Sequence, residues 1–179
     1  IRDSFNMLSG YSEPDSWNKL VIAPIWMRDR FLHMIRMEEE HARKGQKARI
    51  IAKMNSLCDR EIIADLYSAA AAGVKIDLII RGICCLKTGI PGISENITVR
   101  SIVGNFLEHA RIFYFYSNGN EEVYMGSADW MPRNLDKRVE IVFPVEDPRL
   151  KQEVMHILDI QLEDNVKAHI LRPDGTYEK

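Results

Sequence analysis

The sequence predicts an α/β domain in which helices flank a mixed β-sheet, and three patterns support that fold class. Short apolar runs of strand length alternate with helical stretches through the first half of the chain. Glycines stand where those helical stretches should end. In the second half, a turn signal between two β-type runs predicts an antiparallel hairpin. Parallel crossovers followed by a hairpin give a mixed sheet.

The first half of the chain reads as strand, helix, strand, helix, strand. We expect Asp29 to cap the first helix, which Gly45 ends, and Asp59 to cap the second, which Gly73 ends. This order and spacing favour parallel pairing of the strands through right-handed crossovers. The three predicted strands are residues 20–25, 48–54 and 74–80.

The second half begins with a long loop, residues 81–95, which contains several glycines; a compact domain usually keeps such a loop for function. Asn118-Gly119-Asn120 predicts the tight turn of a hairpin between two of the β-type runs that follow. A last helix should begin at Pro148 and continue to about Leu162. The strands predicted here are residues 97–103, 111–116, 122–125 and 139–144.

The composition limits the classes of function. The chain has 179 residues, of which 46% are hydrophobic, and a formal net charge of -2. Nothing in this overall charge attracts nucleic acid or anionic lipid, and no apolar run is long enough for a transmembrane segment. The three cysteines, Cys58, Cys84 and Cys85, lack zinc spacing and favour a reducing cytoplasm, with peripheral membrane association left open. We expect Cys84 and Cys85 to be buried small residues.

Polar side chains follow two of the predicted parallel strands at the point where each strand ends. Lys53 and Asn55 stand at the end of the second strand, and Arg81 follows the third. The carboxyl ends of parallel strands share one edge of a sheet, and ligands bind at that edge. The sequence therefore predicts an anion site there. The alternatives are that Lys53 and Asn55 only close loops, and that Arg81 caps a strand end and forms a salt bridge with Glu95.

A second group of candidates surrounds His109. Histidine has the free side-chain pKa nearest neutrality, so it can attack phosphorus, protonate a leaving oxygen or stand opposite a phosphate. Arg111 offers a forked cation for phosphate oxygens. The other reading of Arg111 is a structural partner of Glu108 or Asp129.

The small pair Gly126-Ser127 follows the predicted hairpin and lets backbone amides and a hydroxyl approach an anion closely. Ser127 either binds phosphate or orients His109. We interpret Asp129 and Asp136 as carboxylates that hold arginines in place, and Trp130 as a packing anchor.

Together these motifs resemble half of a phospholipase D-type site: His, Ala, Arg at 109–111, a hairpin, then Gly, Ser, Ala, Asp, Trp at 126–130 and Arg, Asn at 133–134. That superfamily usually has lysine in place of Arg111 and asparagine in place of Asp129. These departures point to one branch, because residues 53–57, 73–86 and 92–97 are similar to bacterial polyphosphate kinases. The resemblance covers nearly the whole chain.

The resemblance implies a phospholipase D-like fold, with residues 1–170 as a C-terminal catalytic domain and 171–179 as a tail. Ile1 in place of Met also leads us to expect a fragment of a longer protein. Polyphosphate kinases reversibly transfer the γ-phosphate of ATP to inorganic polyphosphate through a phosphohistidine, which here would come from an upstream domain of the same chain. The isolated fragment is therefore expected to be inactive.

Roles for single residues follow from the same resemblance. His109 corresponds to the histidine of the second half, a general acid or electrostatic partner, and Arg81 to an arginine that contacts ATP or ADP. Further substrate-binding candidates are Arg111, Ser127, Lys53 and Asn55. Mg²⁺ is expected in the full enzyme with ligands outside this fragment, which itself has no predicted metal site. We expect a homo-oligomer and no nucleic-acid partner.

Two alternatives remain open at this level. The first is a phosphodiesterase or nuclease of the phospholipase D superfamily that works as a homodimer in which two copies of His109 meet. Arg111 in place of lysine and the long loop of residues 81–95 argue against it. The second is a non-catalytic domain for phosphate binding or assembly.

Overall fold

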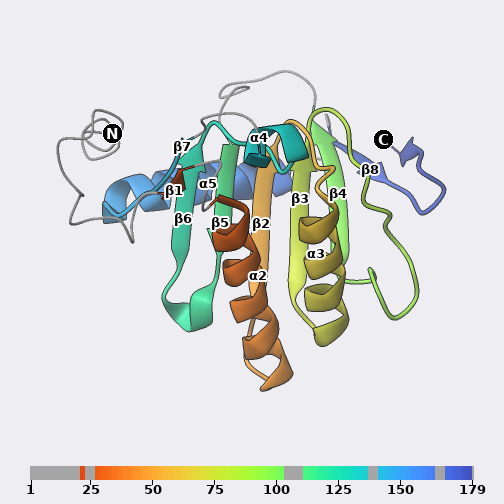
Figure 1. Ribbon diagram of the computed structural model, residues 1–179, viewed down its shortest axis with the longest axis horizontal. Helices are drawn as coiled ribbons and strands as arrows, with labels where there is room; N and C mark the ends of the chain where they lie inside the picture. Colours follow the sequence, from red (N-terminus) through yellow and green to blue (C-terminus); the bar gives the residue numbers. More distant parts are fainter. Residues whose placement is uncertain (1–20, 23–26, 103–110, 137–140, 164–167, 179) are drawn as a thin grey trace.

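The computed structural model describes residues 21–22, 27–102, 111–136, 141–163 and 168–178 (Figure 1). Within these residues, nine strands form one sheet in the order β1-β7-β6-β5-β2-β3-β4-β8-β9. The centre, β2-β3-β4, is parallel, and the strands on both sides join it antiparallel, so the mixed sheet is as predicted. The strands are β1 (Val21–Ile22), β2 (Arg49–Met54), β3 (Lys75–Ile80), β4 (Ile97–Ile102), β5 (Arg111–Phe115), β6 (Glu122–Gly126), β7 (Ile141–Pro144), β8 (Ala168–Leu171) and β9 (Tyr177–Glu178).

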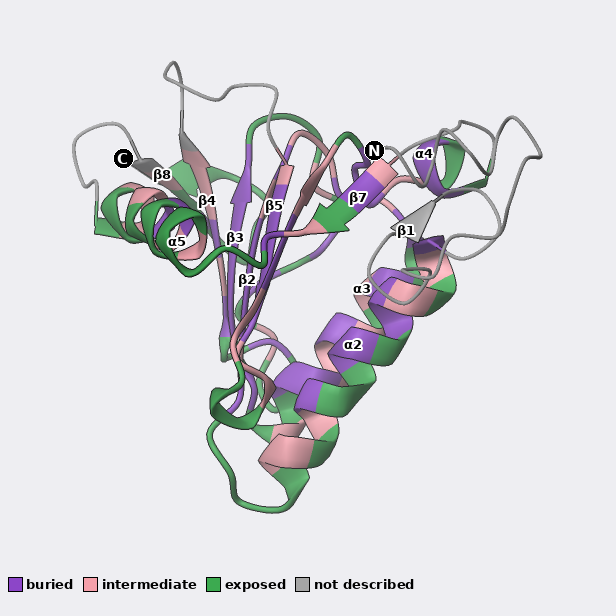
Figure 2. Cartoon of the chain, turned by 90° about the vertical axis from the view of Figure 1, so that its left-hand side faces the viewer, coloured by how far each residue is buried: buried purple, intermediate pink, exposed green. Residues whose placement is uncertain are grey.

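Helices cover both faces of this sheet. Figure 2 shows α2 (Met27–Arg43) and α3 (Arg60–Ala72) on one face and α5 (Pro148–Glu163) on the other. A short helix, α4 (Pro132–Asp136), lies above the strand ends in Figure 1, and a 3₁₀ turn (Ser117–Gly119) joins β5 to β6. The described elements thus form three layers, with the central strands buried between helices.

The larger core lies between the sheet and α2 with α3. Trp130 is fully buried there, 5.4 Å from the ring of Phe31 and 5.3 Å from that of Phe113 between centroids. This confirms Trp130 as a packing anchor. A smaller core, under α5, contains Ile51 and Leu158. Burial on both faces explains why the central strands read as continuous apolar runs.

The helix ends follow the predicted signals with one exception. Asp59 caps α3, its carboxylate accepting a hydrogen bond from Ile62 N at 3.1 Å, and Gly73 ends the helix at φ 113°, where a glycine is favoured. The prediction for Asp29 was wrong, because α2 begins at Met27 and places Asp29 in the first turn. A carboxylate there still interacts favourably with the helix dipole, which is why the sequence signal resembled a cap.

The first predicted strand also pairs differently from the expectation. β1 lies antiparallel beside β7 at one edge of the sheet and does not pair with β2. The other side of β2 is occupied by β5, the first strand of the predicted hairpin. Only β2 and β3 of the three strands therefore form the parallel pair, and the third parallel strand is β4.

Candidate functional site

The strand directions bring most of the predicted site segments to one edge of the sheet. β2 and β3 run parallel and in register, with Met54 opposite Ile80, so their carboxyl ends are adjacent. β5 is antiparallel to β2 and begins at this edge with Arg111, which pairs with Gly126 at the end of β6. The segments that follow β2, β3 and β6 therefore meet at this edge, where Leu57 forms bridges with Cys84 and with Trp130.

Asn55 and Arg81 lie on neighbouring strand extensions. The amide of Arg81 donates to Met54 O at 3.2 Å, and that of Gly82 donates to Asn55 O at 2.7 Å. The Arg81 side chain is exposed, whereas Asn55 is half-buried. A Cβ at position 82 would lie 2.8 Å from Asn55 O, so glycine is what allows the two extensions to pair this closely.

Lys53 and Arg111 reach this edge from opposite faces of the sheet. Side chains alternate along a strand, so Lys53 shares the face of Ile51, which α5 covers. Arg111 shares the face of Phe113, which α2 and α3 cover. Both cations could contact the same ligand only if that ligand lay beyond the ends of the strands. The sequence motif did not reveal this constraint.

Asp129 is the polar centre of the edge. Its Oδ1 accepts hydrogen bonds from Asn55 N at 2.9 Å and from Arg111 Nε at 3.0 Å, and only 6% of the residue is exposed. Its own amide donates to the side chain of Asn134 at 2.9 Å. Arg111 is thus a structural partner of Asp129, as one of the two sequence readings had it, and the predicted role of Asp129 in holding an arginine is confirmed.

The Gly126-Ser127 pair packs directly against β7. The Ser127 hydroxyl is exposed and accepts a hydrogen bond from Ile141 N at 3.2 Å, and the Ser127 amide donates to Ile141 O at 3.0 Å. A Cβ on Gly126 would lie 2.2 Å from Ile141 O. The pair therefore fixes the β6–β7 approach, and the role of Ser127 toward a phosphate stays a prediction.

His109, the main predicted catalytic residue, lies outside the described residues, in the segment 103–110 that precedes β5. Its convergence with Arg81 on one anion therefore stays a prediction.

A second ionic group, on the α2 side of the sheet, was predicted only in part from the sequence. The Arg28 guanidinium donates to Asp59 Oδ2 at 2.7 Å and to Asp136 Oδ2 at 2.8 Å. Hydrogen bonds to Asp136 and then Asp59 raise the pKa of Arg28 further above its usual value, so this cation is permanent. Asp136 was predicted to hold an arginine. Arg28 itself was missed, because it lies far from both partners in the sequence.

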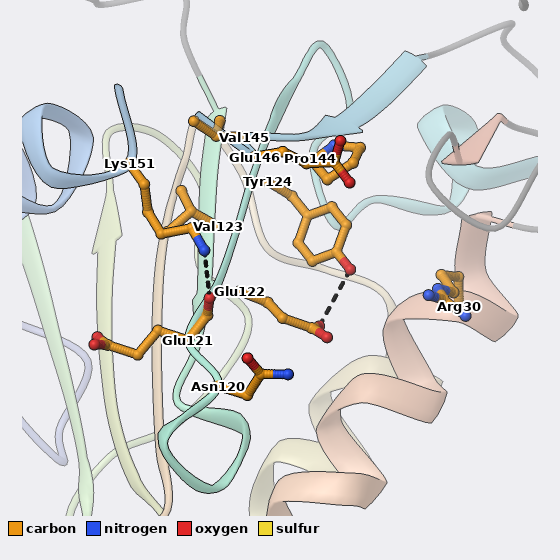
Figure 3. A pocket seen from close by; sticks show the side chains of 10 residues that line it. All are labelled: Arg30, Asn120, Glu121, Glu122, Val123, Tyr124, Pro144, Val145, Glu146 and Lys151. Carbon is orange, nitrogen blue, oxygen red and sulfur yellow. Dashed lines mark hydrogen bonds between the residues drawn. The ribbon is translucent and has the colours of Figure 1, made fainter. Parts of the chain in front are cut away.

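Two hollows flank the sheet ends. One, of about 300 Å³, lies near the β5–β6 turn, away from Gly126, and its lining includes the acidic residues Glu121, Glu122 and Glu146 and the basic residues Arg30 and Lys151 (Figure 3). Burial, and then the neighbouring Glu122, raise the pKa of Tyr124, whose hydroxyl donates to Glu122 at 3.2 Å.

The other hollow, of about 310 Å³, adjoins the predicted anion edge. The loop after β3 forms one wall and the β8–β9 turn the other, with Lys87 and Arg172 among the lining residues. Among the described residues, no group of three or more His, Cys, Asp and Glu could hold a metal ion. None of the described helices is long and apolar enough to cross a bilayer.

Comparison with known proteins identifies relatives over the whole chain. A family model described as "Polyphosphate kinase C-terminal domain 2" matches residues 20–179. A polyphosphate kinase of Thermosynechococcus vestitus is 55% identical over 179 residues, which are 100% of this chain and 24% of that protein. The chain thus spans about a quarter of the length of the curated relatives it matches.

Solved structures agree with these sequence relatives. The crystal structure of polyphosphate kinase from Porphyromonas gingivalis matches with a TM-score of 0.90 and 43% identity, over 98% of this chain and 27% of that one. Nuc from Salmonella typhimurium, a phospholipase D family member, matches with a TM-score of 0.60 and 19% identity, over 86% of this chain and 97% of that one. The second likeness establishes the fold alone, which is the phospholipase D-like fold that the motifs implied.

Proposed function

Because this chain belongs to the polyphosphate kinase family, we propose that it is a C-terminal part of a phosphotransferase. The reaction is the reversible transfer of the ATP γ-phosphate to inorganic polyphosphate, with the phosphohistidine supplied by an upstream domain. The observation that carries the proposal is identity above 50% over the whole chain to polyphosphate kinases.

The geometry of the sheet edge supports this role. Arg81 is exposed on a strand extension that backbone hydrogen bonds hold against Asn55. A guanidinium there offers forked donors to a nucleotide phosphate. Asp129 holds Arg111 with an N–O distance of 3.0 Å, so the guanidinium has a fixed orientation at the same edge.

Phosphoryl transfer depends on positioning and on stabilising charge at the equatorial oxygens, and little covalent chemistry is asked of the protein. In this proposal Arg81 binds nucleotide phosphate, and His109 donates a proton to the leaving oxygen or neutralises charge on it. Lys53, Asn55 and Ser127 are further phosphate contacts. When bound, Mg²⁺ would neutralise phosphate charge. Among the described residues no group of three or more His, Cys, Asp and Glu could hold the ion. The roles proposed here for residues of this chain therefore do not include binding Mg²⁺.

A chimera tests the proposal. The matching quarter of the Thermosynechococcus vestitus kinase is replaced by this chain, and transfer of label from [γ-³²P]ATP to polyphosphate is measured. We expect the chimera to turn over and this chain alone to be inactive. A correctly folded chimera without transfer, beside an active parent enzyme, would contradict the proposal.

Single variants of the chimera separate the two main roles. His109→Ala should lower kcat by about 10²–10³-fold, the usual effect of removing one preorganised charge stabiliser. Arg81→Ala should raise the KM for ATP by about tenfold, which corresponds to about 1.4 kcal/mol of binding. Lys75→Ala is the matched control, because Lys75 is an exposed cation at the opposite end of β3. An unchanged KM in Arg81→Ala would exclude its nucleotide role.

The same preparations test the phosphodiesterase alternative. Hydrolysis of bis(p-nitrophenyl) phosphate by this chain alone, lost in His109→Ala, would favour a homodimeric phospholipase D-type enzyme instead. The proposal also includes a homo-oligomeric full enzyme in the cytoplasm, which sedimentation of the chimera and fractionation of cells that express it would check.

A further inference from the structure

The cysteines at the sheet edge form a pair that the sequence did not indicate. The expectation of two buried cysteines was wrong for Cys85, which is exposed, while Cys84 is half-buried against the larger core. Cys85 Sγ lies 2.7 Å from Cys58 Sγ, across an interval of 27 positions in the sequence. A disulfide has an S–S bond of about 2.05 Å, so the two sulfur atoms need to close by less than about 1 Å.

Backbone hydrogen bonds hold the two cysteines in this position. The Cys85 amide donates to Leu57 O at 2.9 Å, and the Leu57 amide donates to Ile83 O at 2.9 Å. The Cys58 amide donates at 2.8 Å to the carbonyl of Trp130, whose side chain is fully buried. The sulfur atoms therefore meet because both of their backbones are tied to the same strand-end framework, so neither loop has to rearrange to join them.

Of the two cysteines, Cys85 is the more accessible to a small oxidant. Cys85 is exposed and lines the hollow of about 310 Å³ beside the β8–β9 turn. Cys58 is partly buried. Burial, and then the hydrogen bond with Cys85, raise the pKa of the Cys58 thiol to about 12, so at neutral pH Cys58 stays protonated and Cys85 is the sulfur that meets the oxidant first.

We propose that Cys58 and Cys85 are a peroxide-sensitive modification site that forms a reversible disulfide between the loops after β2 and β3. The Cys85 thiolate attacks hydrogen peroxide and the O–O bond breaks. Hydroxide departs, and Cys85 becomes a sulfenic acid. The Cys58 sulfur then attacks that sulfenic sulfur, the S–O bond breaks, and the departing hydroxide takes the Cys58 proton as water. Peroxide gains two electrons and each sulfur loses one. A thiol reductant reverses the step.

The disulfide would join the two strand extensions at the predicted anion edge without using any of the predicted ligand-binding residues. Asn55 precedes Cys58, and Arg81 precedes Cys85, on the two extensions that the disulfide would join. Transient disulfides of this kind occur in reducing compartments. Formation of the bond itself does not depend on the kinase proposal.

Peptide mapping of the folded chain tests the site. The 179-residue chain is treated with hydrogen peroxide in native buffer, blocked with iodoacetamide, digested without reductant and analysed by mass spectrometry. We expect one cross-linked species that joins the Cys58 peptide to the Cys84-Cys85 peptide and disappears with dithiothreitol. Cys84→Ser should keep the link, whereas Cys85→Ser and Cys58→Ser should lose it.

Thermal unfolding provides a second readout that does not rely on one variant folding well. The oxidised wild-type chain and oxidised Cys84→Ser should melt at a higher temperature than their reduced forms, because the link restricts the unfolded chain. Reduced and oxidised Cys85→Ser should melt alike. A link through Cys84, or one that forms only in urea, would overturn the proposal, as would peroxide treatment that leaves Cys58 fully alkylated by iodoacetamide.

Discussion

The Asp129 carboxylate holds two segments of the sheet edge together, and its removal should have a large effect. Asp129→Ala leaves the Arg111 guanidinium, of which 17% of the side chain is exposed, without its carboxylate partner. Breaking a largely buried pair from one side typically costs about 3 kcal/mol. We expect that loss in the free energy of unfolding measured by urea titration.

Two other variants calibrate this result. Asp129→Asn keeps an oxygen for the Asn55 amide but removes the negative charge, so it should lose less stability than Asp129→Ala. Asp136→Asn removes a more exposed carboxylate, with 45% of its side chain accessible, and should change stability by less than about 1 kcal/mol. Equal losses in all three variants would contradict the role given to Asp129.

Glu38 should make stability depend on pH. It is 1% exposed, and its carboxylate accepts hydrogen bonds from the amides of Arg49 and Ser117 at 3.2 and 2.6 Å. Burial is the largest influence and raises its pKa above the usual 4.5. The folded state then binds the proton more tightly than the unfolded state, so this contribution is full below the unfolded pKa and is lost as the pH rises through the folded one.

The measurement compares wild type with Glu38→Gln in urea titrations from pH 4 to pH 8. The stability of wild type minus that of the variant should fall as the pH rises through this interval. A difference that stays level or increases with pH would show that the two amide donors outweigh burial.

At the residue scale, the sequence predicted the roles of single side chains better than it predicted which residues they contact. Asp129 and Asp136 were correctly interpreted as carboxylates that hold arginines. The contacts of Arg28 with Asp59 and of Cys85 with Cys58 were not predicted, because these partners lie 31 and 27 positions away in the sequence. No local pattern encodes such pairs before the strand order is known.

At the scale of elements, the approach of β6 to β7 depends on one glycine. A Cβ at position 126 would lie 2.2 Å from Ile141 O and 2.8 Å from Val142 Cα, and both are backbone atoms that cannot turn aside. Gly126→Ala should therefore push β7 away and destabilise the chain by about 2 kcal/mol, as measured by thermal or urea unfolding.

Ser127→Ala is the neighbouring control. It removes one exposed hydrogen bond to the Ile141 amide and should cost less than about 1 kcal/mol. If Gly126→Ala were as stable as Ser127→Ala, the close approach of the two strands would not be needed for the fold.

Most helices and strands were predictable because apolar periodicity and caps are local. The short elements were not: β8, β9 and α4 carry too few residues for a period to be recognised. The ion pairs of Asp77 were missed as well. Asp77 is 2% exposed in the middle of β3 and pairs with Arg49 of β2 at 2.9 Å and Arg100 of β4 at 2.8 Å, which requires knowledge of the strand neighbours.

At the scale of the whole molecule, the β8–β9 hairpin belongs to the sheet although it comes last in the chain. Leu171 is 8% exposed within the larger core, and its carbonyl accepts a hydrogen bond from the Thr88 hydroxyl at 3.0 Å. A chain that ends at residue 170 should lose about 3 kcal/mol of unfolding free energy, because a buried leucine disappears.

The truncated chain also tests the predicted boundary between a domain at 1–170 and a tail at 171–179. Arg172→Ala in the full chain is the control, since the Arg172–Glu178 pair is exposed and should contribute little. Unfolding of the truncated chain at the same urea concentration as the full chain would mean that residues 171–179 are a tail.

The candidate site illustrates why whole-molecule arrangement is the hardest level to predict. The sequence correctly brought Asn55 and Arg81 to one edge, because parallel strands end together. It did not reveal that Lys53 and Arg111 approach from opposite faces, because that follows from the antiparallel entry of β5 beside β2.

The positions of β1 and β9 have a mechanical consequence. They lie at opposite edges of the described sheet, and each is attached through two residue pairs. A force pulling the two apart therefore acts across the strands and detaches them one at a time from the outside. In an optical trap, the outer strands should peel away in short early steps at low force. The parallel centre, clamped between its helices, should then rupture last and in a single event.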